Sequence, residues 1–271
     1  TCTPVYPPFL SAPDWQGKTL VTSDLKLEQE TWTFDFADLE KKVTPRTKAF
    51  FLCNPHNPVG RVFRRDELEQ LVDFCEAHDL ILISDEIHCD LVFSGHQHIP
   101  TQTLGEKARK RTITLMAPSK TYNLPGLCCA YAVIENPDLR LAFAKAARGF
   151  ITEVNAFGYA GCAAAYDHGE PWRQALMARL EANRDRLYAF VTEHLPEIQM
   201  WPMEATYLAW LKVDSLGLEN PGAHFEAHGI GLSNGADFGD SRFLRLNFGC
   251  SAEQLEKGLA CLEDAVRAAR K

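Results

Sequence analysis

The chain has 271 residues, of which 46% are apolar and 24% are charged, an ordinary composition for a globular protein whose sizeable core we expect to fall into two domains. Its formal net charge of −8 argues against nucleic acid or an anionic membrane as the main partner, because both call for a basic face. No apolar run approaches the roughly 18 residues that a membrane-spanning helix needs, and no signal peptide is visible.

Nine cysteines are scattered along the chain without the spacing of a disulfide framework. None forms a Cys-x-x-Cys pair, and an odd number in a chain of this length is typical of reduced thiols. We therefore expect a cytoplasmic protein. The adjacent Cys128 and Cys129 are expected to be small core residues on a buried strand.

The chain begins at Thr1 rather than at a methionine. Its opening stretch, TCTPVYPPFL, looks like the middle of a domain, because a strand-like start runs directly into a proline turn. We therefore expect the natural protein to have a further N-terminal segment.

The first half of the chain alternates buried strands with helical stretches. The stretch DELEQLVDFCEAHDL, residues 66–80, places Leu68, Leu71 and Cys75 on one face at helical spacing. Acidic residues in its first turn suit the helix dipole. Short apolar runs predict strands over residues 48–54, 80–84, 112–116 and 129–133. Continuous apolar strands separated by helices predict an α/β fold with a mainly parallel sheet.

After Asn136 the pattern changes. Residues 138–195 are predicted to be mostly helical, and two later stretches alternate as strands do, before a final amphipathic helix over 252–269. The two strand-like stretches are residues 205–213 and 243–250. We predict a large domain with a helical connector over residues 1–164 and a smaller α+β domain over 165–271. Glu204 precedes a strand of that domain and is a candidate to face a site on proximity alone.

Three polar motifs follow the predicted parallel strands. CNPHNPVG follows the first strand, SDEIHCD ends the second and APSK ends the third. Ligands of open α/β sheets bind outside the carboxyl ends of the strands. We therefore expect the side chains of these motifs to converge on one pocket. The candidates are Asn57, Asp85, His88 and Lys120.

A lysine at the end of a buried strand is unusual, because lysine is rarely buried without a partner. An amine can form a Schiff base with a carbonyl, and a carboxylate can keep a ring nitrogen protonated. Lys120 with Asp85 and the amide of Asn57 therefore matches pyridoxal phosphate chemistry. Taken singly, the three could instead be a surface lysine, a loop carboxylate and a turn residue before Pro58.

The motifs NPHNPVG, SDEIHCDLVF, APSKTYNLPG and RLNFG together resemble fold-type I pyridoxal phosphate enzymes of the class I/II aminotransferase superfamily. More narrowly, they resemble its cystathionine β-lyase (C–S lyase) branch of the MalY/PatB type. The resemblance covers nearly the whole chain in the right order. It implies a transferase-like α/β large domain with a smaller C-terminal domain, and pyridoxal phosphate as the cofactor.

By this resemblance, Lys120 is the lysine that forms the Schiff base with the cofactor. Asp85 is the partner of the pyridine nitrogen, and Asn57 donates to the cofactor's O3′. Tyr6, in TPVYPPF, resembles the aromatic residue that stacks on the pyridine ring. Ser119 resembles a contact on the phosphate side.

Arg245, in RLNFG, resembles the arginine that grips the substrate α-carboxylate, for which its planar fork is suited. His88 stands where many aminotransferases carry tyrosine, and it is either a packed residue near the cofactor or a proton carrier. Cys128 stands where many relatives place an arginine on the phosphate. These two positions favour the lyase branch.

The resemblance implies a β-elimination that cleaves L-cystathionine or a related cysteine S-conjugate to a thiol, pyruvate and ammonia. It also implies a homodimer of the full-length protein, with an amino acid as the small-molecule substrate. An aminotransferase is the alternative enzyme, and a non-catalytic or regulatory fragment is the alternative of another class. A zinc site is not expected, because His88, Cys89, His96 and His98 match no usual spacing.

Overall fold

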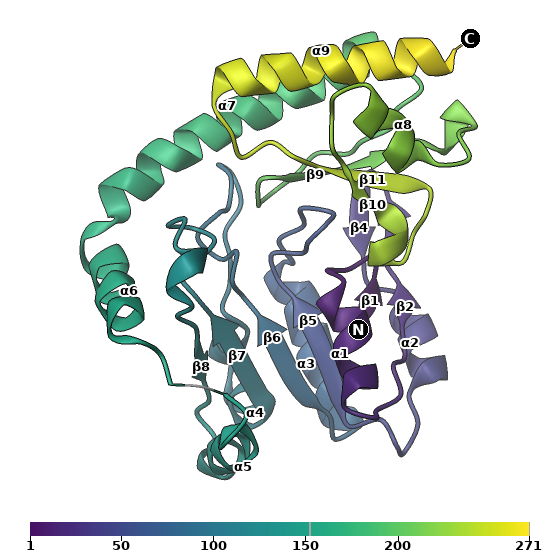
Figure 1. Ribbon diagram of the computed structural model, residues 1–271. Coiled ribbons are helices and arrows are strands. Elements are labelled where there is room, and N and C mark those ends of the chain that lie inside the picture. Colours follow the sequence, from purple (N-terminus) through teal and green to yellow (C-terminus); the bar gives the residue numbers. More distant parts are fainter. Residues whose placement is uncertain (152, 271) are drawn as a thin grey trace.

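The computed structural model describes residues 1–151 and 153–270 (Figure 1). The helices are α1 (Pro8–Trp15), α2 (Phe36–Lys42), α3 (Arg65–Ala77), α4 (Glu106–Arg111), α5 (Pro137–Ala147), α6 (Ala156–His168), α7 (Glu170–His194), α8 (Pro221–Ala227) and α9 (Ala252–Ala269). The strands are β1 (Cys2–Thr3), β2 (Ser23–Asp24), β3 (Lys26–Glu28), β4 (Thr31–Thr33), β5 (Ala49–Cys53), β6 (Ile81–Asp85), β7 (Thr112–Met116), β8 (Tyr131–Val133), β9 (Leu208–Lys212), β10 (Ser233–Asn234) and β11 (Phe243–Asn247). Short 3₁₀ turns are η1 (Thr101–Leu104), η2 (Pro125–Leu127), η3 (Asp214–Leu216) and η4 (Gly235–Phe238).

The central sheet has the strand order β5-β6-β7-β8. The first three strands are parallel and β8 is antiparallel to β7, so the predicted mainly parallel α/β sheet is confirmed. Asp85, at the end of β6, is paired with Cys53 of β5 and with Leu115 of β7. The carboxyl ends of these strands therefore lie at one edge of the sheet, where the polar motifs follow.

Helix α3 links β5 to β6 and buries the apolar face that the sequence predicts. Leu68, Leu71 and Cys75 are all fully buried. The Glu67 carboxylate accepts a hydrogen bond from the backbone N–H of Arg64 at 2.7 Å, which satisfies a donor at the helix start that would otherwise lack a partner. The helix is thereby fixed at both its start and its buried face.

The second sheet has the order β10-β11-β9 and is antiparallel. Figure 1 shows α7 reaching from α6, beside the central sheet, to the end of the molecule that carries α9. Leu180 and Leu187 of α7 share a buried cluster with Leu259 and Leu262 of α9. Helix α9 has the predicted bounds, and its N-cap Ser251 accepts a hydrogen bond from the backbone N–H of Gln254 at 3.2 Å.

Some local predictions were wrong. Helix α1 follows the proline turn at the start of the chain, where no helix was predicted. Strand β9 begins at Leu208 rather than at 205, because Thr206 has a left-handed backbone with φ of 73°. Cys128 is exposed, with φ of 51°, and precedes β8, whereas Cys129 is buried. The predicted domain division at residues 164 and 165 stays a prediction.

All nine cysteines are free thiols in the structure. Over residues 1–151 and 153–270, no helix has the length and apolar character needed to span a membrane.

Gly60 lies in the crowded turn over residues 57–60 that follows β5, and replacing it with alanine should destabilise the protein. Its φ is +72°, and an added Cβ would meet Met203 Cβ at 3.1 Å and the Ala205 carbonyl oxygen at 3.2 Å. Gly95 is a matched control, because its φ is +88° and its added Cβ would have no neighbour within 4 Å. We expect Gly95→Ala to cost about 1–2 kcal/mol and Gly60→Ala about 1–3 kcal/mol more. Urea unfolding measures both, and equal losses would contradict the close contact.

Candidate active site

Backbone hydrogen bonds hold the ends of the parallel strands together just before the polar motifs diverge. The Asn54 N–H donates to the Asp85 carbonyl at 3.0 Å, and the Glu86 N–H donates to the Leu115 carbonyl at 3.0 Å. Asn57 lies three residues beyond the first of these bonds, and Lys120 lies five residues beyond Leu115. The strand register therefore brings the segments that carry Asn57, Asp85 and Lys120 to the same edge of the sheet.

Asp85 is a partly buried carboxylate with little to stabilise its charge. Burial raises its pKa to about 6, against the opposing effects of the Ile87 N–H, which donates to Oδ1 at 3.1 Å, and of the nearby Lys120 charge. The charge of Glu86 raises the pKa further. No arginine or lysine forms an ion pair with Asp85 among the described residues. A carboxylate that lacks an ion-pair partner is well placed to accept a hydrogen bond from a positively charged ring N–H, which would stabilise its charge.

Lys120 lies in the turn that directly follows β7. The Tyr122 N–H donates to the Pro118 carbonyl at 2.9 Å, and the Leu124 N–H donates to the Ser119 carbonyl at 3.1 Å, so the turn is closed around the lysine. Lys120 is partly buried and has no carboxylate within ion-pair distance over residues 1–151 and 153–270. Ser119 precedes it in the same turn. The amine is therefore available to another group.

Arg245 reaches the same place from β11. Its Nη1 donates to Asn57 Oδ1 at 3.1 Å, and its Nη2 donates to Ser233 Oγ at 3.2 Å. Its guanidinium carbon lies 4.6 Å from the centre of the Phe238 ring. Its buried Nε has no hydrogen-bond partner among the described residues. Burial lowers the pKa of the guanidinium, and an incoming anion would offset that cost.

His88 is a buried neutral imidazole. Burial, followed by the charges of Lys120 and Arg245, lowers its pKa to about 3. Its Nδ1 has no partner in the described part of the chain. Its ring packs edge-on against Tyr207, with 6.1 Å between ring centres.

Tyr6 and Tyr207 flank Arg245 and are near enough to raise its pKa. Tyr6 is 39% exposed and follows the β1 segment. Tyr207 is partly buried, and burial raises the pKa of its phenol. Gly249 packs against the Tyr207 side chain, because a Cβ added there would lie 3.2 Å from Tyr207 Cγ.

The structure thus brings together the side chains that the sequence predicted. These are Asn57, Asp85, His88, Lys120, Arg245 and Tyr6, with Ser119 next to Lys120. It adds Tyr207, Ser233 and Phe238, which sequence reasoning missed. Tyr207 falls within residues 205–213, which the sequence predicted as a strand, and only its place near the start of that stretch distinguishes it from core aromatics. Ser233 and Phe238 carry no sequence signal. Glu204 does not face this site, because its carboxylate binds Arg61.

The donor set fits pyridoxal phosphate. Among the described residues, it has an amine without an ion-pair partner, a partly buried carboxylate with a raised pKa, an amide and an arginine with an unpartnered N–H. Over residues 1–151 and 153–270, no three His, Cys, Asp or Glu side chains gather as metal ligands.

Comparison with known proteins identifies the family of this chain. The family model described as aminotransferase class I and II matches residues 1–262. The chain belongs to the class I and II aminotransferase family. Within that family, cystathionine β-lyase PatB of Bacillus subtilis (strain 168) is 34% identical over 270 residues, which cover 97% of this chain and 70% of PatB.

Solved structures of the family superpose closely on this chain. OvoB is 44% identical, with a TM-score of 0.96 over 98% of this chain and 70% of OvoB. Cystalysin of Treponema denticola, which contains a pyridoxal 5′-phosphate cofactor, is 32% identical, with a TM-score of 0.93 over 98% of this chain and 70% of cystalysin. The predicted fold and family are confirmed.

Replacing Asp85 with asparagine should stabilise the cofactor-free protein at neutral pH. The carboxyl pKa is about 6 when folded against an ordinary 3.8, so wild-type stability falls as the pH rises from about 4 to about 6. We expect Asp85→Asn to exceed wild type by about 1–3 kcal/mol at pH 8 and to match it below about pH 4. Urea titrations across this range measure the difference, with the exposed Asp167→Asn as a control. A pH-independent or reversed difference would contradict the buried, weakly paired carboxylate.

Proposed function

We propose that the protein is a pyridoxal phosphate-dependent carbon–sulfur β-lyase, which cleaves cysteine S-conjugates such as L-cystathionine to a thiol, pyruvate and ammonia. The observation that carries the proposal is the position of Lys120 and Asp85 at the paired ends of β6 and β7, with Arg245 and Asn57 beside them. The likeness to PatB along nearly the whole chain supports the lyase branch.

Five residues would bind the cofactor, each at a different group. The Lys120 amine would hold it covalently, and the Asp85 carboxylate would accept the ring N–H, which offsets the cost of burying that charge. The Asn57 amide nitrogen would donate to O3′, since its Oδ1 already accepts from Arg245. The Tyr6 ring would cover the face of the ring, and Ser119 would contact the phosphate. When bound, the cofactor supplies an electron sink for cleavage at the substrate α-carbon.

Arg245 would bind the substrate α-carboxylate. Its free Nε–H and its Nη groups lie in one plane, and that fork suits a carboxylate. With the carboxylate held there, the Lys120 amine, once released from the cofactor, would take the α-proton. His88 would stay neutral at physiological pH and so would shape the wall of the site rather than store a proton.

We also propose a cytoplasmic homodimer with a large domain over 1–164 and a small domain over 165–271. Free thiols throughout the chain support the compartment. Large apolar side chains beside and on α6 and at the start of α7 are exposed, which is typical of an interaction surface. They are Phe150, Ile151, Phe157, Tyr159 and Trp172.

The lyase proposal predicts pyruvate from L-cystathionine and pyridoxal phosphate with no keto acid supplied. Lactate dehydrogenase-coupled NADH oxidation measures it. Lys120→Ala should lower the rate by about 10²–10⁴-fold or more, because it removes the proposed base. Lys257→Ala, an exposed lysine paired with Glu253, is the control and should retain the wild-type rate. Amino transfer to an added keto acid without pyruvate release would indicate an aminotransferase instead, and no reaction of either kind would contradict both.

A further inference from the structure

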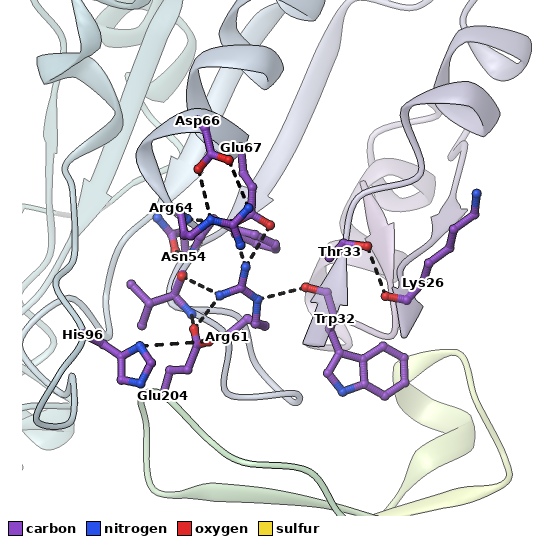
Figure 2. A network of polar contacts seen from close by, with 12 residues as sticks. Lys26, Trp32, Thr33, Asn54, Arg61, Arg64, Asp66, Glu67, His96 and Glu204 are labelled. Atoms are coloured by element: carbon purple, nitrogen blue, oxygen red, sulfur yellow. Dashed lines mark hydrogen bonds and ion pairs between the residues drawn. The ribbon is translucent and has the colours of Figure 1, made fainter. Parts of the chain in front are cut away.

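Arg61 is a buried arginine outside the proposed site, and all three nitrogens of its guanidinium donate hydrogen bonds. It is 4% exposed. Nη2 donates to both oxygens of Glu67 at 2.8 and 2.6 Å, and Nη1 donates to Glu204 Oε2 at 2.6 Å (Figure 2). Nε donates to the Trp32 carbonyl at 2.9 Å, and Nη1 also donates to the Val62 carbonyl at 2.9 Å. Each of the three guanidinium nitrogens therefore has at least one acceptor. We call Arg61, Glu67 and Glu204 the Arg61 clamp.

One side of the clamp is the turn that carries Asn57. The His56 N–H donates to the Arg61 carbonyl at 2.8 Å, and the Gly60 N–H donates to the His56 carbonyl at 2.8 Å. Asn57 lies inside this closed turn. The position of its amide therefore depends on where Arg61 is held.

The other side of the clamp is the segment that leads into Tyr207. The N–H groups of Glu204 and Ala205 both donate to the Gly60 carbonyl, at 2.9 and 3.0 Å. The Thr206 N–H donates to the Leu91 carbonyl at 2.8 Å. Residues 204–206 thus lie between two segments of the first half of the chain. The left-handed backbone of Thr206 then sets the direction of Tyr207.

Both sides of the clamp meet again at Arg245. Asn57 Oδ1 accepts from its Nη1, and Tyr207 lies near its guanidinium. The clamp is close in sequence to both neighbours of Arg245. Asn57 lies four residues before Arg61, and Tyr207 lies three residues after Glu204. A shift of the clamp would therefore move two neighbours of Arg245 together.

We propose that Glu204 and Arg61 are positioning residues for the substrate carboxylate. By joining the asparagine turn to the segment before Tyr207, their ion pair fixes Asn57 and Tyr207 around Arg245. This inference rests on the proposed function of Arg245 as the carboxylate grip. A buried ion pair is a weak source of stability compared with apolar packing, but it fixes the geometry of the groups that it joins.

The test compares Glu204→Ala with Glu204→Gln. Alanine removes one of the two acceptors of Arg61 Nη1 and the acceptor of the Val62 N–H, whereas glutamine keeps an acceptor oxygen. We expect Glu204→Ala to raise KM for L-cystathionine about 10–100-fold, since a misplacement of about 1 Å can cost on the order of 10²-fold. We expect kcat to change less than KM, and Glu204→Gln to recover most of the loss.

Glu197→Ala is the matched control. Glu197 also forms a two-bond ion pair with an arginine, Arg270, but at an exposed position. It should leave KM unchanged. A clamp that acts only on stability would lower the melting temperature of Glu204→Ala without changing KM, and that result would overturn the inference.

A crystal structure of Glu204→Ala gives a readout that does not depend on activity. We expect the Asn57 Oδ1–Arg245 Nη1 distance to lengthen from 3.1 Å beyond hydrogen-bonding range. An unchanged distance would overturn the inference even if the lyase activity is real. Conversely, a lengthened distance in a protein without lyase activity would support the positioning role of the clamp and refute the proposed function.

If Glu204→Ala does not fold, the same distance and KM are measured in Glu67→Gln, which weakens the other ion pair of Arg61.

Discussion

The parallel pairing of β5, β6 and β7 is the constraint on which the rest of the structure depends. Asp85 is in register with Cys53 and Leu115, so the segments that follow β5 and β7 leave the sheet next to the Asp85 carboxylate. A one-residue slip of β6 would turn Asp85 to the opposite face of the sheet, away from Lys120. The burial of Leu68 and Leu71 on α3 and of Leu82 in β6 holds that register, so apolar packing far from the chemistry fixes the relative positions of the amine and the carboxylate.

The buried charges fall into two kinds. Among the described residues, every nitrogen of the Arg61 guanidinium donates a hydrogen bond, whereas Asp85 accepts one backbone hydrogen bond and Arg245 Nε has no partner. Satisfied groups fix the scaffold, and unsatisfied groups carry a cost that a bound partner can remove. The raised pKa of Asp85 and the lowered pKa of Arg245 both express that cost, which is why we propose these side chains, and not Arg61, as the ones that bind the cofactor and the substrate.

Local sequence patterns were sufficient for the elements that hold the first half of the site. Apolar runs gave β5, β6 and β7, and polar motifs at their ends gave Asn57, Asp85 and Lys120. Local sequence patterns could not predict contacts between segments that are distant along the chain. Nothing near Glu204 in the sequence indicates that it binds Arg61, 143 residues away, and the left-handed backbone of Thr206, which shortens β9, is set by the segments on either side of it. The sequence therefore offered no reason to place Tyr207 at the site, although it lies near Arg245.

The central claim is that Lys120 is the residue to which pyridoxal phosphate binds covalently. The most direct measurement is to add the cofactor, reduce with sodium borohydride and locate the pyridoxyl group by peptide mass spectrometry. We predict stoichiometric labelling of the peptide that contains Lys120. Labelling of a different lysine, or none at all, would contradict the claim that the ends of β6 and β7 form the cofactor site.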